Sequence, residues 1–148
     1  MLKKPSIKYK SYEKMKKIVL LLSAFFLFIS CTPDQDIYSI EVLPVESVSD
    51  LPLEFVLGET YKIKMNFRRP TTCHALYGIY YEKELNTRTF AVRNLKEHRG
   101  DCIELTDVII SQTFDFEVTN TGNYIFKFWT GKDAEGNNTY LEYDIPVN

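Results

Sequence analysis

Strict alternation of apolar and polar side chains is the feature that most restricts how this chain can fold. From Thr60 to Phe67 (TYKIKMNF), the odd-numbered residues are apolar and the even-numbered residues are polar. Thr113–Val118 and Leu141–Val147 repeat the pattern. Successive side chains of a β-strand point to opposite faces, so the alternation predicts strands that bury one face only.

Turn-forming residues divide the remaining chain into further short strands. We expect these strands at Ile37–Val42, His74–Glu84, Thr87–Arg93 and Asn123–Trp129. After residue 36, no segment sustains apolar residues at helical spacing. About seven short strands in a domain of this length predict an all-β fold, a single antiparallel sandwich of two sheets.

A tyrosine that follows a turn adds detail to this prediction. Thr119–Phe126 (TNTGNYIF) places Gly122 two residues before Tyr124, at the start of the penultimate strand. This arrangement resembles the tyrosine corner of immunoglobulin-like and fibronectin-III-like sandwiches, which gives Tyr124 a structural role. The resemblance covers residues 37–148 and implies an immunoglobulin-like sandwich. The inter-sheet cysteines and core tryptophan of antibody domains are missing, so the resemblance points to no particular family.

The first 30 residues have the pattern of an export signal. A lysine pair precedes the uncharged run Ile18–Ile29, which is shorter than the ~20 residues of a membrane-spanning helix and typical of a signal-peptide core. Residues 1–30 are therefore predicted to be a signal peptide. Because an ordinary signal sequence begins at Met15, we expect this methionine to be the true start.

The end of the apolar run, Leu27–Cys31 (LFISC), resembles a bacterial lipobox, in which a small residue precedes a cysteine that becomes diacylated. On that resemblance Cys31 carries a lipid anchor, and residues 31–36 form an acidic tether. The pattern is similar to small outer-membrane lipoproteins of Bacteroidota-type bacteria, which implies display at the cell surface, with the periplasmic face as the alternative. A secretory signal without lipidation, or an uncut anchor, also fits the run.

The charge balance changes once the signal is set aside. Residues 31–148 hold 11 Lys and Arg against 19 Asp and Glu, a net charge of −8, whereas the whole chain carries −2. Such an acidic domain repels phosphate backbones, so we expect no nucleic-acid partner. The expected partners are the membrane, through the lipid, and a glycan or another envelope protein.

Two cysteines, Cys73 and Cys102, remain after Cys31. In an exported protein we expect them to form a disulfide. The only histidines, His74 and His98, lie near them, so a soft site for zinc or Cu(I) is the alternative. No CxxC or HxxxH spacing supports this site, so we expect no metal and no cofactor. The alternative function is that of a periplasm-facing metal-binding or chaperone-like envelope lipoprotein.

Catalytic motifs are missing from the sequence. It contains no GxSxG, no glycine-rich phosphate loop and no HExxH. Glu82 and Glu84 share one strand face, but such pairs are usually solvated surface. We therefore expect a binding or structural module and no enzyme.

Alternation also places a set of aromatic residues on the outer face of one sheet. If every second residue from Tyr124 faces the core, its neighbours on that strand face outward. Exposed tryptophan and tyrosine are typical of sugar-stacking platforms and of protein hot spots. The candidate binding face consists of Trp129, Tyr140, Tyr80, Ile125 and Lys127. The alternative is that a loop such as Leu95–Cys102 covers this face.

Overall fold

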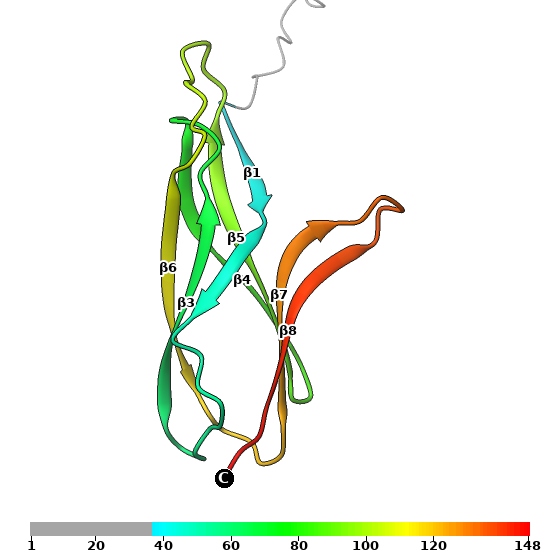
Figure 1. Ribbon diagram of the computed structural model, residues 1–148. Coiled ribbons are helices and arrows are strands. Elements are labelled where there is room, and N and C mark those ends of the chain that lie inside the picture. Colours follow the sequence, from blue (N-terminus) through cyan, green and yellow to red (C-terminus); the bar gives the residue numbers. More distant parts are fainter. Residues whose placement is uncertain (1–36) are drawn as a thin grey trace, which may run out of the picture. The chain divides into compact units, whose positions relative to one another are not determined.

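The computed structural model describes residues 37–148 (Figure 1). The predicted signal peptide 1–30, its start at Met15, the lipidation of Cys31 and the tether 31–36 therefore lie outside the described residues. Within residues 37–148 there are eight β-strands, and no helix is long and apolar enough to cross a membrane.

The strands form two sheets, which confirms the predicted all-β, two-sheet architecture. The strands are β1 (Tyr38–Leu43), β2 (Val45–Ser49), β3 (Thr60–Arg68), β4 (His74–Glu84), β5 (Thr87–Glu97), β6 (Ile109–Glu117), β7 (Tyr124–Lys132) and β8 (Asn138–Ile145). One sheet has the order β2-β3-β6. In the other, β4 pairs with one side of β5, while β1 and β7 share its other side and β8 follows β7. In Figure 1, β3 and β6 lie on the left and β7 and β8 on the right.

The predicted number of strands, about seven, was one too few because no strand was predicted at Val45–Ser49, where β2 lies. Pro44 separates β1, which pairs with β5, from β2, which pairs with β3 in the other sheet. Proline has no backbone N–H to donate to a ladder, so it suits the point at which a strand changes sheets. β5 and β6 also extend further than alternation alone predicted, through Glu97 and back to Ile109.

The strand order differs from that of an immunoglobulin domain, in which the fourth strand belongs to the sheet of the second and fifth strands. There, the third and sixth strands are neighbours. If β1 and β2 count as one strand, these would be β4 and β7. Here β5 lies next to β7 instead, and β4 lies at the sheet edge. Because β5 and β7 run parallel, the prediction of a purely antiparallel sandwich is wrong at this pair.

Aromatic rings dominate the core between the sheets. The buried rings are Phe55, Phe67, Phe90, Phe116, Tyr124, Phe126 and Phe128. Burying a side chain of this size contributes about 1.5–3 kcal/mol. Tyr124 is fully buried, and its hydroxyl accepts a hydrogen bond of 2.9 Å from the backbone N–H of Asn120.

Candidate functional site

The outer faces of the two sheets have opposite character. On the three-stranded sheet the outer face is polar, and Lys62 and Arg68 form ion pairs there with Asp115 at 2.8 Å and Glu46 at 2.9 Å. On the five-stranded sheet the outer face exposes large apolar side chains, among them Tyr38, Ile40, Val42, Tyr77, Tyr80 and Ile125. Exposed apolar surface of this kind marks binding sites more often than polar surface does.

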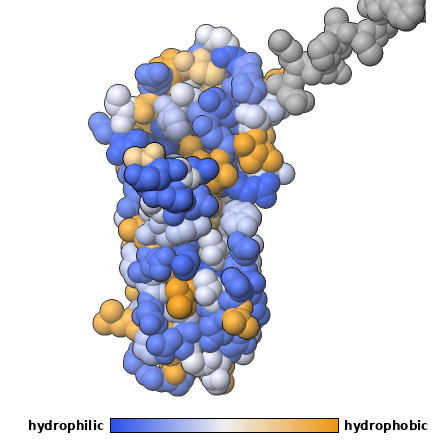
Figure 2. Space-filling view, turned by 90° about the vertical axis from the view of Figure 1, so that its right-hand side faces the viewer, coloured by the Kyte–Doolittle hydropathy of each residue, from blue (hydrophilic) through white to orange (hydrophobic). Residues whose placement is uncertain are grey.

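Figure 2 shows the side of the domain that faces right in Figure 1. Hydrophobic residues appear there as separate areas within a mostly hydrophilic surface. A continuous apolar interface of the kind found in permanent complexes is therefore not present on this side. Local sites, each with a few aromatic contacts, fit this surface better.

Three of the predicted binding residues meet in a hollow on the outer face of the five-stranded sheet. Trp129 on β7 lies opposite Tyr140 on β8, and Tyr80 on β4 lies opposite Ala91 on β5. The small side chains of Ala91 and Thr89 lie between the larger rings and leave a hollow of about 300 Å³. We call it the aromatic hollow; its lining also includes Val42, Glu82 and Asn138.

The other two predicted residues lie on the same face but outside the hollow. Lys127 has its Nζ 5.6 Å from the centre of the Tyr140 ring and pairs with Glu142 at 3.0 Å. Ile125 is exposed further along β7. The segment Leu95–Cys102 was the alternative cover for this face; its first three residues belong to β5, and none of its residues lines the hollow.

Hydrogen bonds fix two of the rings in the aromatic hollow. Trp129 Nε1 donates to Asn138 Oδ1 at 3.1 Å, and the Tyr80 hydroxyl donates to Glu82 Oε2 at 3.0 Å. The hydrogen bond to Glu82, followed by the negative charge of that carboxylate, raises the pKa of Tyr80 above its ordinary value. Because the rings are held before any ligand arrives, less conformational entropy is lost on binding.

Sequence reasoning missed the polar and small residues of the hollow. Glu82 and Glu84 are exposed, as expected, but Glu82 also accepts the hydrogen bond of Tyr80 and lines the hollow, whereas Glu84 does not line it. Thr89 and Ala91 matter because they are small. The alternation of side chains places Thr89 and Ala91 on the same face of their strand. It does not predict that this strand lies between β4 and β7.

The Cys73–Cys102 pair and His74 form a separate group at the start of β4. Cys73 and Cys102 are joined by the expected disulfide, with an S–S distance of 2.00 Å. His74 is buried, and its Nε2 donates to Glu41 Oε2 at 2.7 Å while Nδ1 lies 2.8 Å from Thr71 Oγ1. The side chain of His98 is exposed.

This cluster offers little to a metal ion. Both thiols are oxidised in the disulfide, and both ring nitrogens of His74 have hydrogen-bond partners. Residues 37–148 contain no group of three His, Cys, Asp or Glu side chains placed to hold a metal. The hydrogen bond from His74, and then the charge of Lys96, hold the pKa of Glu41 below its ordinary value against the opposing effect of partial burial.

Comparison with known proteins yields no relative from which a function could be transferred. No family model matches the chain, and no curated protein or solved structure matches it. What the chain does is therefore inferred from its own sequence and geometry.

Proposed function

We propose that this protein is an outer-membrane lipoprotein, anchored through Cys31, whose sandwich domain binds a glycan at the cell surface in the aromatic hollow. It acts by binding, without catalysis. The lysine pair, apolar run and small residue that precede Cys31 support the anchor, and the acidic tether that follows it supports surface display.

The observation that carries the binding proposal is the convergence of Trp129, Tyr140 and Tyr80 on one hollow of about 300 Å³. A sugar ring has an apolar face that stacks on aromatic rings and hydroxyl groups that need hydrogen-bond partners. Glu82 supplies acceptor oxygens beside the rings. Small-molecule sites combine an apolar lining with a few placed polar groups in this way.

The scaffold supports presentation of this face. We propose that it is an immunoglobulin-like sandwich in which the β4–β5 hairpin is reversed, so that β5 occupies the place next to β7. The buried Tyr124 and its hydrogen bond to the Asn120 N–H support this assignment. The reversal brings Thr89 and Ala91 beside Trp129, and thereby creates the hollow.

Fluorescence of the chain's single tryptophan, Trp129, tests the binding proposal directly. We expect a glycan from a panel of surface polysaccharides to shift the emission saturably. Calorimetry with Trp129→Ala should then show at least a tenfold loss of affinity, because truncation of a central aromatic anchor costs about 2 kcal/mol or more. Tyr77→Ala is the control, since Tyr77 is an exposed tyrosine outside the hollow. Full binding by Trp129→Ala would exclude the hollow as the site.

Protease shaving of intact cells tests the location independently of the ligand. We expect the wild-type protein to be cell-bound and cleaved, and Cys31→Ala to be released or mislocalised. If the wild-type protein is anchored but protected from protease, it faces the periplasm, and surface glycans are not its ligands.

A further inference from the structure

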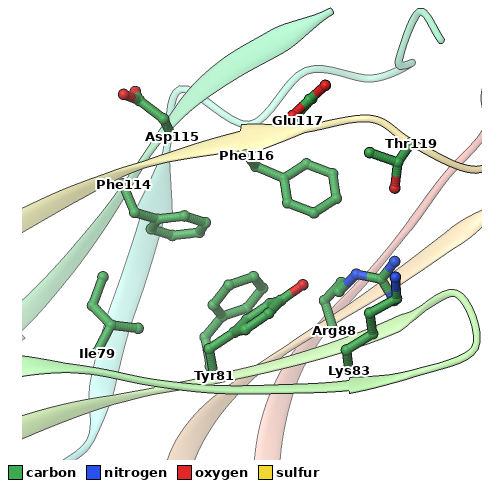
Figure 3. Close-up of a pocket in the computed structure, with 10 residues that line it drawn as sticks. Ile79, Tyr81, Lys83, Arg88, Phe114, Asp115, Phe116, Glu117 and Thr119 are labelled. Carbon is green, nitrogen blue, oxygen red and sulfur yellow. The ribbon is translucent and has the colours of Figure 1, made fainter. Parts of the chain in front are cut away.

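A second cleft lies between the two sheets, at the side where both have an edge. Among the described strands, β4 pairs only with β5 and β6 pairs only with β3, so β4 and β6 are edge strands. The space between them is a cleft of about 370 Å³, which we call the edge cleft (Figure 3). Because it opens between the sheets, its walls are inner-face residues that elsewhere form the core.

The walls of the edge cleft are aromatic. Phe90 of β5 has its ring centre 4.6 Å from that of Phe114 on β6 and 5.3 Å from that of Tyr81 on β4. Tyr81 pairs with Phe90 in register and so points to the inner face, yet 51% of it is exposed. An inward-facing ring stays half in water here because no described strand covers the edge.

A buried arginine lies at one end of this aromatic wall. Arg88 is 1% exposed, and its Nη1 donates to the carbonyl oxygens of Leu85 at 2.6 Å and Thr87 at 2.9 Å. Its guanidinium carbon lies 4.8 Å from the centre of the Tyr124 ring. These contacts hold the side chain in place but use only part of its five N–H donors.

Arg88 has no counter-charge among residues 37–148. None of the ion pairs there includes it, and its buried Nε has no hydrogen-bond partner. The carboxylates of Asp115 and Glu117 point away from the cleft in Figure 3, and Asp115 is paired with Lys62 on the outer face. Arginine is almost never fully buried without a partner, so an acceptor from outside the domain is expected at this position.

Other donors gather at the same end of the cleft. Lys83 is the register partner of Arg88 on the neighbouring strand, and in Figure 3 both side chains extend from the β4–β5 hairpin toward the same end of the cleft. The hydroxyl groups of Tyr81 and Thr119 point toward the same space. Two cationic side chains and two hydroxyl groups at one end of the cleft favour binding of an anion. If the anion also has an apolar part that displaces water from the aromatic wall, its binding free energy becomes more favourable.

We propose that the edge cleft binds a small amphipathic monocarboxylate. Its carboxylate lies between Arg88 and Lys83, and its apolar body lies against Phe90 and Phe114. A multiply charged ligand such as a phosphate ester fits less well, because residues 31–148 have a net charge of −8. The volume falls in the range of ~300–1,000 Å³ that is typical of small-molecule sites.

This site is separate from the aromatic hollow. Tyr80 lines the hollow and its neighbour Tyr81 lines the edge cleft, since adjacent residues of a strand point to opposite faces. Failure of glycan binding in the hollow would therefore leave the carboxylate site untouched, and the reverse also holds.

Two probes that differ only in charge test the proposal. Amide NMR spectra of the full-length chain with Cys31→Ser are titrated with 4-phenylbutyrate and, separately, with neutral 4-phenylbutyramide. We expect 4-phenylbutyrate to shift the amides of Tyr81, Phe114 and Thr119, and to bind about tenfold more tightly than the amide, because only the acid forms charge-assisted hydrogen bonds. The Trp129 indole signal should not move.

Variants separate this site from general changes in charge. Lys83→Met should weaken 4-phenylbutyrate several-fold and leave 4-phenylbutyramide unchanged, whereas Lys62→Met, on the outer face of β3, should change neither. Arg88→Met should abolish the difference in affinity between 4-phenylbutyrate and 4-phenylbutyramide. If the Arg88→Met protein does not fold, the result for Lys83→Met alone tests the proposal. Equal affinity for acid and amide, shifts confined to Trp129, or no shift at millimolar probe with a folded spectrum would each overturn the proposal.

Discussion

Removal of the Cys73–Cys102 disulfide should destabilise the domain without changing its native structure. The disulfide joins the segment before β4 to the segment before β6, and backbone hydrogen bonds join the same two segments. Thr72 N–H donates to Ile103 O at 2.9 Å, and Leu105 N–H donates to Pro70 O at 2.8 Å. These bonds remain when the sulfurs are separated, so the main effect is expected in the unfolded chain.

The magnitude follows from the length of the closed loop. The cysteines are 29 residues apart. For a loop of this length the chain-entropy relation gives about 12 cal/mol/K, or about 3.6 kcal/mol at 25 °C. For a domain of this size, such a loss lowers the midpoint of thermal unfolding by on the order of 15 °C.

Urea unfolding of Cys73→Ala/Cys102→Ala measures this loss, with Cys31→Ser in all proteins to prevent thiol exchange. We expect the free energy of unfolding to fall by about 3.6 kcal/mol and the m-value to rise, because an unfolded chain without the cross-link exposes more surface. Reduction of the parent protein with dithiothreitol should give the same change. A loss below about 1 kcal/mol, with a native-like NMR spectrum, would show that the disulfide does not act through the unfolded chain.

Three further predictions concern single side chains. Tyr124→Phe should lower the free energy of unfolding by about 1 kcal/mol in urea titrations, because the Asn120 N–H loses its acceptor; an unchanged value would mean that water replaces the hydroxyl at no cost. Leu85→Asn should raise the free energy of unfolding by roughly 1 kcal/mol. Residue 85 has φ +51°, a left-handed conformation that asparagine adopts more readily than leucine, and it is 87% exposed, so little apolar contact is lost. A lower stability would contradict this explanation. The lowered pKa of Glu41 stabilises the fold above the carboxyl's ordinary value of 4.5, and this stability is lost as the pH falls through the folded-state pKa. With Glu41→Gln, the free energy of unfolding should therefore vary less with pH in that acidic range. The difference from the parent should stay below about 1 kcal/mol, since the Glu41 side chain is 41% exposed. If the two curves of stability against pH are parallel, the His74–Glu41 interaction is not the source of the acid sensitivity.

Much of the aromatic hollow could be predicted from the sequence. Trp129, Tyr140 and Tyr80 were assigned to an outer face because side chains alternate along each strand. Glu82 and Ala91 were not recognised, since their role depends on which strands lie beside theirs. The edge cleft was missed altogether. Alternation places Arg88 on the inner face with Phe90, but only the folded hairpin shows that turn carbonyls hold the guanidinium there.

The sequence alone determined that the domain is built of β-strands with one buried face and which residues of each strand face the core. These are local properties: the side-chain period of two depends only on neighbouring residues. The tertiary structure decided the order of the strands. Alternation assigns each residue of β4 and β5 to one face of its strand but does not say which of the two strands pairs with β7, so the local pattern does not distinguish the two orders. The observed order puts β5 inside and β4 at the edge, and both the aromatic hollow and the edge cleft result from that choice.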